Sequence, residues 1–253
     1  MYLTRVYLNP HRRGCRHLVS SLQRLHAAVL TGFPPGALRT EGEGRVLWRL
    51  DRPSDNRRVS RSTDTDVGRG LCLYISSPVA PDPAALVEQA GYETAGGVVV
   101  KKLDDFLAKL EKDQLWGFRI TVNPTYRHTD GDGRKRLMGH VTVARQTQWL
   151  LDRAEANGFQ IPMSAEVGGD LPVLENEAGE RVDGRNLLVA LVDRRVENFV
   201  RVRSGDKNPV TLKLATFQGT LKVTDPQALR SALANGIGRA KGYGAGLLTL
   251  ARP

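Results

Sequence analysis

The order of strand-like and helix-like segments constrains the fold of this chain more than any single motif does. In the first hundred residues, apolar residues that alternate along the chain predict four strands, and apolar residues at helical spacing predict two helices. The strands are expected at 1–9, 45–50, 70–76 and 96–103, and the helices at 16–31 and 82–91. This order, β-α-β-β-α-β, is that of the ferredoxin-like unit.

A second cycle of the same kind follows. Strands are expected at 116–124, within 185–202 and 209–224, and at 245–251, and helices at 146–158 and 225–236. The apolar alternation slips phase near Ala215, which predicts a β-bulge or a bend there. Asp225 and Pro226 are typical of a helix N-cap and first turn. We therefore expect an α+β fold of two tandem ferredoxin-like domains, although the halves show no obvious sequence repeat.

The polar, lysine-bearing stretch after residue 103 is the expected domain boundary. We predict an N-terminal domain over 1–104, a linker over 105–113 and a C-terminal domain over 114–253. Two segments of the second domain are expected to be mobile. One is a turn-rich basic loop over 127–140, and the other is an acidic, glycine-rich segment over 168–184 that is a candidate for disorder.

The charge points to nucleic acid. Lysine and arginine exceed aspartate and glutamate by ten, and the isoelectric point is about 9.9. An excess of this size is typical of proteins that bind phosphate backbones. Arginine supplies 28 of the 37 basic residues. A proteome that prefers arginine would explain that ratio, but it would not explain the net charge. The low aromatic content of 6% argues against a stacking platform for long single strands.

Other classes of protein are disfavoured. No run of 18 apolar residues is present, and the N-terminus lacks the apolar core of a signal peptide, so we expect a cytoplasmic protein without membrane contact. The two cysteines, Cys15 and Cys72, stand far apart and fit a reducing compartment. No cysteine or histidine pair has zinc-ligand spacing, and we expect neither a metal nor a small-molecule cofactor.

The closing stretch "GIGRAKGYGAGLL" resembles a nucleotide-binding loop at first sight. Its glycines are Gly236, Gly238, Gly242, Gly244 and Gly246. A dinucleotide site needs the order strand, glycine loop, helix, whereas here a helix precedes the loop and a strand follows it. Two interpretations remain. The glycines form a tight turn, or their N–H groups form an anion-binding nest to which Arg239 and Lys241 add charge.

Four segments resemble the CasE family, the endoribonucleases that process CRISPR RNA in type I-E systems. They span both ends and the middle of the chain, and the closing one is the most specific. The segments are "MYLTRVYLNP", "LQRLHAAVLTGFP", "FRITVNP" and "QGTLKVTDPQALRSALANGIGRAKGYGAGLLTLA". The resemblance implies tandem ferredoxin-like domains, binding of the hairpin of a CRISPR repeat RNA, one cut at the base of its stem, and metal-independent chemistry. It also implies that the product stays with other subunits of a surveillance complex.

Metal-free cleavage of RNA uses the 2′-hydroxyl as the nucleophile and leaves a 2′,3′-cyclic phosphate and a 5′-hydroxyl. Histidine suits the proton transfers, because its ordinary pKa lies near neutrality. His26 corresponds to the catalytic histidine of the family. From the helix alone, His26 is equally a border residue that packs and bonds a backbone carbonyl. His128 and His140 are expected to face solvent or RNA phosphate.

The chain departs from the family at three places. Gln23 stands where familiar members carry a tyrosine, so either Gln23 only positions the RNA or another group, such as Tyr243, compensates. Thr121 replaces a frequent arginine. Residues 27–32 contain no lysine, which some relatives have there. Charge stabilisation would then come from other cations. The candidates are Arg16, Arg24, Arg239 and Lys241, and we place Lys241 with His26 and Gln23 in the predicted catalytic set.

Binding of RNA is expected on three basic surfaces and the glycine loop, mainly through shape and phosphate contacts. For each basic residue the alternative is an ordinary solvated surface. The first surface is Arg12, Arg13 and Arg16, the second is Arg134, Lys135 and Arg136, and the third is Arg194, Arg195, Arg201, Arg203 and Lys207. Arg24, on the predicted catalytic helix, is a further RNA-binding candidate. The loop contributes Gly238, Arg239, Gly242, Tyr243 and Gly244. A non-catalytic hairpin-binding subunit of the same fold and an unrelated basic nucleic-acid binder remain the alternative functions.

Overall fold

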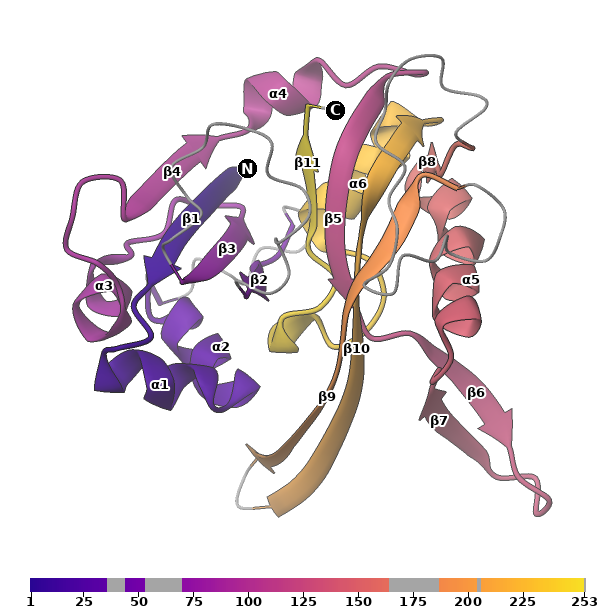
Figure 1. The fold of residues 1–253 in the computed structure, drawn as a ribbon, viewed down its shortest axis with the longest axis horizontal. Helices are drawn as coiled ribbons and strands as arrows, with labels where there is room; N and C mark the ends of the chain where they lie inside the picture. The colour runs from indigo at the N-terminus through magenta and orange to yellow at the C-terminus, as the bar shows by residue number, and fades with distance from the viewer. Residues whose placement is uncertain (36–43, 53–69, 164–186, 204–205, 253) are drawn as a thin grey trace. The chain divides into compact units, whose positions relative to one another are not determined.

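The computed structural model describes residues 1–35, 44–52, 70–163, 187–203 and 206–252, and only the backbone of 202, 203 and 206 (Figure 1). The predicted disordered segment 168–184 lies outside these residues. The chain divides into two compact units. The first unit is Met1–Ala108 with Lys241–Gly244, and the second is Lys109–Ala240 with Ala245–Pro253. Four residues of the glycine loop therefore belong to the first unit, and the division after Ala108 falls within the predicted linker.

The first unit has the ferredoxin-like fold that the segment order predicts. Its sheet has the strand order β2-β3-β1-β4 with every pair antiparallel. Figure 1 shows α1, α2 and α3 gathered on one side of the sheet. The elements are β1 (Tyr2–Leu8), α1 (Arg13–Val19), α2 (Leu22–Leu30), β2 (Leu47–Asp51), β3 (Leu71–Ser77), α3 (Ala84–Ala90), β4 (Val98–Lys102), α4 (Asp104–Ala108) and the 3-10 turn η4 (Lys241–Tyr243).

The prediction of one continuous helix over 16–31 is wrong, because the structure has two helices there. Ser21 adopts an extended conformation, with φ −150° and ψ 122°, at the N-cap position of α2, where its side chain makes no capping hydrogen bond. Serine has a lower helix propensity than alanine or leucine, so a break at this position costs little. The apolar stripe survives the break: Leu22, Leu25 and Val29 of α2 are buried. The break therefore changes the direction of the chain just before His26.

The second unit is also ferredoxin-like, with the strand order β11-β5-β10-β8 and β9 paired to β10. Its elements are β5 (Leu115–Val122), β6 (Thr125–Thr129), β7 (Lys135–Gly139), α5 (Val143–Ala154), the 3-10 turn η2 (Glu155–Asn157), β8 (Phe159–Gln160), β9 (Val189–Arg203), β10 (Asp206–Val223), α6 (Pro226–Asn235) and β11 (Leu248–Ala251). A register shift occurs close to the predicted position, between Thr216 and Phe217, but the extra residue is Val192 of β9, and β10 pairs with β5 in continuous register. Asp225 caps α6 by accepting hydrogen bonds from the backbone N–H groups of Gln227 and Ala228.

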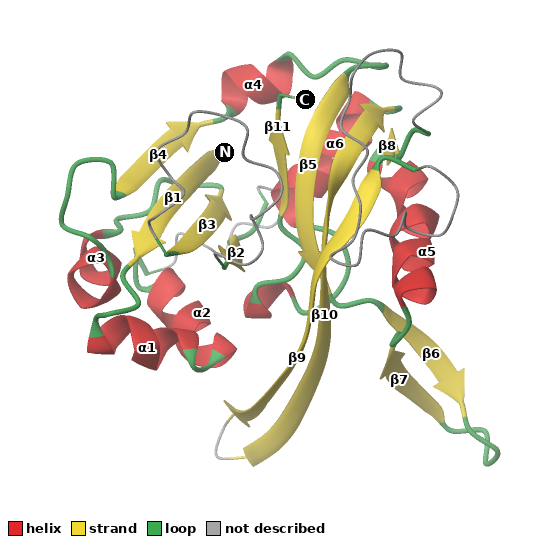
Figure 2. Cartoon of the chain, in the orientation of Figure 1, coloured by secondary structure: helices red, strands yellow, loops and turns green. Residues whose placement is uncertain are grey.

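The expectation of an irregular basic loop over 127–140 is wrong. Strands β6 and β7 form a two-stranded hairpin there, which projects from the second unit in Figure 2. Its turn is built by Asp130, whose carboxylate accepts hydrogen bonds from the N–H groups of Asp132 and Arg134 at 3.2 and 2.8 Å. Gly133 supplies the positive φ of 75° that the turn requires. Local hydrogen bonds thus order a sequence that looks purely loop-forming.

Both cysteines, Cys15 and Cys72, are buried free thiols. Burial raises the pKa of both, that of Cys72 to about 12, so neither is a reactive thiolate at neutral pH. Within the described ranges, every helix is too short or too polar to cross a bilayer.

Candidate active site and nucleic-acid interface

His26 lies on α2 at the border of the buried stripe, where its side chain is half-buried. Trp48, from the neighbouring strand β2, donates a hydrogen bond from its indole N–H to Nδ1 of His26 over 3.3 Å. Trp48 is only 1% exposed, so this donor is held in place by the core. No pattern in the sequence indicates this contact, and Trp48 is a site residue that the sequence analysis missed.

The hydrogen bond from Trp48 selects one state of the imidazole. Because Nδ1 accepts, a neutral His26 carries its hydrogen on Nε2. An imidazolium would carry a hydrogen on Nδ1 as well, and it could not accept from the indole. The pKa of His26 is lowered by burial and then by the positive charge of Arg45. His26 is therefore neutral at neutral pH, with its Nε2–H as the available edge.

The backbone of the glycine loop covers one face of His26. A Cβ atom built on Gly242 would lie 3.4 Å from Nε2, 3.6 Å from Cε1 and 3.8 Å from Cδ2 of the imidazole. These distances are nearly equal, so that atom would sit over the ring face rather than in line with the Nε2–H bond. The ring of Tyr243 lies 6.4 Å from the imidazole, centroid to centroid, at 59°. The loop thus brings the ring of Tyr243 near His26, and Gly242 lies over the face of the imidazole rather than at its Nε2 edge.

Four of the five loop glycines have a positive φ, so conformation accounts for them without any ligand; they are Gly236, Gly238, Gly244 and Gly246. Gly244 has a φ of +78°, and a Cβ atom there would lie 2.7 Å from the indole of Trp48. Gly238 has a φ of +82°, and its Cβ would lie 2.7 Å from the indole of Trp149. A side chain at either position would clash, and positive φ disfavours one as well. The anion-nest interpretation is therefore not needed to explain the glycines, and it stays a prediction.

Two cations accompany His26 in the first unit. Lys241 begins the turn η4, which packs against α2 and β2, and within the described part of the chain its ammonium has no hydrogen bond or ion pair. The pKa of Lys241 is lowered by burial and then by Arg45, the cation that also lowers the pKa of His26. Arg45, exposed at the start of β2, was missed by the sequence analysis. The site is electropositive, which suits a phosphate.

Gln23 lies on α2 one turn before His26 and is partly buried. Residues three positions apart on a helix share a face, so Gln23 and His26 point the same way. The structure thus places two of the predicted catalytic residues together on α2, and it places Lys241 in the same unit on a turn that contacts that helix.

The first basic surface is partly occupied by internal contacts. The guanidinium of Arg12 donates to the carbonyl oxygens of Val87 and Glu88 and pairs with Glu93 at 2.7 Å, which ties α1 to the end of α3. Arg16 donates to the backbone carbonyls of Pro10 and His11, and Arg24 donates to Ser20 Oγ. Arg13 is exposed and has no such partner among the described residues.

The second and third basic surfaces lie on hairpins of the second unit. Arg134, Lys135 and Arg136 are exposed on the turn and strand of the β6–β7 hairpin, where Arg136 pairs with Asp130 at 3.4 Å. On β9, Arg201 is exposed, whereas Arg195 is only 16% exposed and pairs with Asp193 and Glu197. Arg194 donates to the backbone carbonyl of Val141. Lys207 is exposed on β10, and the side chain of Arg203 lies outside the described atoms.

Comparison with known proteins decides the family. A family model described as "CRISPR associated protein" matches residues 1–252. This chain belongs to that family. It is 28% identical over 253 residues to the CRISPR-associated endoribonuclease Cse3 of Thermus thermophilus, a match that covers 99% of this chain and 100% of the relative.

Solved structures agree. A structure of the CRISPR endoribonuclease Cse3 bound to a 19-nucleotide RNA has a TM-score of 0.70 at 25% identity, and the match covers 99% of this chain and 100% of that one. A chain of a CRISPR RNA-guided surveillance complex, captured before nicking, has a TM-score of 0.61 at 22% identity over 100% of both chains. This second likeness concerns the fold alone.

In this CRISPR-associated protein, the departure at Thr121 has a structural explanation. The hydroxyl of Thr121 lies 2.8 Å from that of Thr216, and both side chains are 1% exposed. Position 121 therefore holds a buried hydrogen-bonded pair between β5 and β10. His128 is exposed, as expected, whereas His140 stacks on Tyr126 with ring centroids 4.7 Å apart.

Proposed function

We propose that this chain is an endoribonuclease that binds the hairpin of a CRISPR repeat RNA and cuts precursor transcripts at the base of the stem. We further propose that it needs no metal and stays with its product in a complex with other CRISPR subunits. Membership of the family, the named activity of the Thermus relative and the RNA in the Cse3 structure support the substrate class. The observation that carries the activity is the orientation of His26 in an electropositive site.

The reaction is an internal transfer at phosphorus. The 2′-oxygen upstream of the cut bonds to the phosphorus, and the bond from the phosphorus to the 5′-oxygen breaks. The 2′-hydroxyl releases its proton to solvent and the departing 5′-oxygen takes one from solvent, so the products are a 2′,3′-cyclic phosphate and a 5′-hydroxyl. The protein must stabilise negative charge on the phosphorane and help both proton transfers.

We assign His26 the role of donor. Trp48 occupies Nδ1, so the imidazole presents Nε2–H to the scissile phosphate. A neutral imidazole can stabilise a developing oxyanion through such a hydrogen bond without first losing a proton. Lys241 and Arg45 add positive charge. Gln23 positions the RNA, and Tyr243 supplies the aromatic hydroxyl that Gln23 lacks.

Cleavage in the presence of a chelator tests the proposal. The full chain is incubated with a repeat hairpin RNA in excess EDTA, and cutting at one site with a cyclic phosphate end is expected. His26→Ala should slow cutting by about 10²–10³-fold and leave hairpin affinity nearly unchanged, since removal of one hydrogen-bond donor to a developing oxyanion typically costs that much in rate. His17→Ala, which changes an exposed histidine of α1, is the matched control and should cut normally.

Each outcome has a defined meaning. An RNA with 2′-deoxyribose just upstream of the cut should bind and resist cleavage, and cutting of that RNA would exclude the internal nucleophile. Tight binding without any cutting would support a non-catalytic hairpin-binding subunit. Equal affinity for the hairpin and for random duplex would support an unrelated basic binder.

A further inference from the structure

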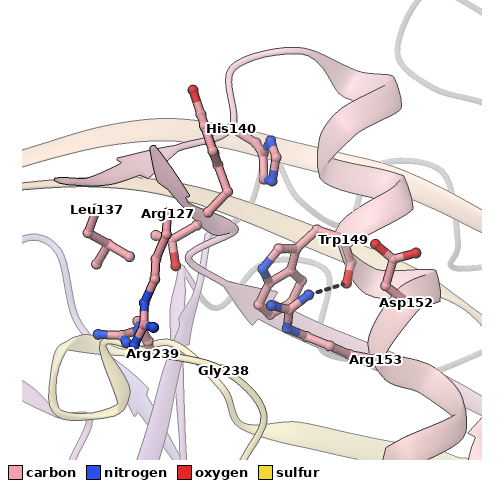
Figure 3. A pocket seen from close by; sticks show the side chains of 10 residues that line it. Arg127, Leu137, His140, Trp149, Asp152, Arg153, Gly238 and Arg239 are labelled. Atoms are coloured by element: carbon pink, nitrogen blue, oxygen red, sulfur yellow. Dashed lines mark hydrogen bonds between the residues drawn. The ribbon is translucent and has the colours of Figure 1, made fainter. Parts of the chain in front are cut away.

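The second unit contains a cavity that the proposed cleavage site does not use. It has a volume of about 510 Å³ and is lined from the β6–β7 hairpin, from α5 and from the loop after α6. This volume is within the usual range of sites for small organic ligands. Figure 3 shows Trp149 and Arg153 of α5 on one side of the cavity, with Arg127 and Arg239 on the other.

The cavity contains an unused hydrogen-bond donor. Trp149 is 3% exposed, and its indole N–H is buried without a hydrogen-bond partner among the described residues. In Figure 3 the indole nitrogen lies on the side of the ring that faces Arg127 and Arg239. Leaving a buried donor unpaired is unfavourable, and native structures do so rarely. The donor therefore points to a ligand that carries an acceptor atom.

The charge of the lining favours an anionic ligand. The lining contains three guanidinium groups, those of Arg127, Arg153 and Arg239, and only one carboxylate, that of Asp152. Within the described chain, the side chains of Arg127 and Arg239 have no hydrogen bond or ion pair. Guanidinium groups bind phosphate through paired N–H donors.

The cavity also has aromatic surfaces suited to a planar ligand. Arg153 lies over the ring of Trp149, with its central carbon 4.0 Å from the ring centroid. Tyr126, which is 41% exposed, stacks on His140 at the rim. Aromatic rings and guanidinium planes are the groups on which proteins stack unpaired bases.

We propose that this cavity is a subsite for one unpaired nucleotide of the RNA. The base lies against the planar groups of the lining and accepts a hydrogen bond from Trp149, while Arg127 and Arg239 bind the adjoining phosphates. This inference rests on the proposed function, because it assumes that the chain binds a CRISPR repeat hairpin. The subsite adds a requirement for an unpaired base beside the stem.

The chain itself limits where that nucleotide lies in the RNA. Arg239 is three residues before Gly242, whose backbone covers His26. Three residues span at most about 11 Å between Cα atoms. The nucleotide in the cavity is therefore expected within a few positions of the scissile phosphate, on a single-stranded flank of the stem.

The experiment measures coupling between one base and one N–H group. Hairpins with one to three unpaired nucleotides on either flank, each nucleotide replaced in turn by an abasic site, are titrated against the full chain and against Trp149→Phe. In the wild type, one abasic position should weaken binding about five- to 150-fold. Trp149→Phe should weaken binding of the intact RNA about two- to tenfold and should add nothing to the loss at that position.

A matched variant and a bare stem complete the design. Trp116→Phe removes an indole N–H in the same unit that bonds Gln114 and does not line the cavity, so its affinity for every RNA should equal that of the wild type. Both phenylalanine variants should bind the hairpin without flanks as the wild type does. If Trp149→Phe fails to fold, Arg127→Gln takes its place, because that side chain is exposed and unpaired within the described residues. It should weaken binding of the flanked hairpins and leave binding of the bare hairpin unchanged, and an equal loss for both RNAs would overturn the subsite.

The outcomes separate the two proposals. The subsite would be overturned if the loss of affinity from Trp149→Phe and the loss from the abasic site multiply at every position. That result would leave the proposal of hairpin binding intact. Failure to bind the bare hairpin would instead overturn the proposed function. Free nucleoside monophosphates are titrated as a second arm. Micromolar binding of a monophosphate without any coupling in RNA would show a site for a free nucleotide and would also overturn the subsite.

Discussion

Replacing Trp48 with phenylalanine is expected to raise the pKa of His26. The indole N–H donates only to the neutral imidazole, because the imidazolium carries a hydrogen on Nδ1. The bond therefore stabilises the neutral form and lowers the pKa. Phenylalanine keeps most of the ring in the core but lacks the donor, so the neutral form loses this advantage.

The size of the shift follows from the geometry. A neutral hydrogen bond contributes about 0.5–1.5 kcal/mol, and about 1.4 kcal/mol corresponds to one pKa unit. The distance of 3.3 Å is longer than the most frequent N–H distances, which places this bond in the lower half of the range. We expect a rise of about half a unit. The smaller ring also leaves a void in the core, which should cost about 1–3 kcal/mol of unfolding free energy.

Two measurements check this prediction. Two-bond ¹H–¹⁵N spectra should show His26 of the wild type as the Nε2–H tautomer, and a pH titration should show its pKa rising in Trp48→Phe. The pKa of His26 is lower in the folded state than in the unfolded state, so the unfolded state binds more protons near pH 6. The unfolding free energy that His26 contributes is therefore present above about pH 6.5 and is lost as pH falls. Trp48→Phe should therefore lose less unfolding free energy on acidification than the wild type does.

The control and the contrary result are equally specific. Trp116→Phe, which removes an indole N–H from the second unit, should leave the titration of His26 unchanged. If Trp48→Phe also leaves the pKa and the tautomer of His26 unchanged, the indole does not select the imidazole state. The donor role proposed for Nε2–H would then lose its basis.

Three further predictions concern the glycine loop and α6, the helix that precedes it. Gly244→Ala should lower the unfolding free energy by about 1–3 kcal/mol, since its φ is +78° and the methyl group would meet Trp48 at 2.7 Å. Gly242→Ala is the control and should cost less, because its nearest contact lies at 3.4 Å. Equal losses of the two variants in urea denaturation would contradict the close contact between position 244 and Trp48. Lys241→Gln should reduce the slope of log affinity against log salt by about one if this ammonium binds a phosphate. Asp225→Ala should cost about 1 kcal/mol in thermal unfolding, because it removes the cap of α6.

Local patterns in the sequence were sufficient to predict most of the fold. Alternating apolar residues and helical stripes predicted both β-α-β-β-α-β cycles, and Asp225 was correctly placed as a helix cap. These features depend on residues close together in the chain. The errors arose where a short-range detail outweighed the pattern, as at Ser21, where an extended serine divides a predicted helix, and at Asp130, where one carboxylate orders a turn.

The position of His26 could be predicted from the sequence, but its chemical state could not. The sequence by itself determined the two ferredoxin-like cycles, the basic charge and a histidine on the first helical segment. Only the tertiary structure decided that Trp48 holds Nδ1, that Gly242 covers the ring face and that Trp149 has an unpaired donor in a cavity. Periodicity reports which way a side chain faces, whereas these contacts join residues far apart in the chain and exist only once the strands and helices have packed.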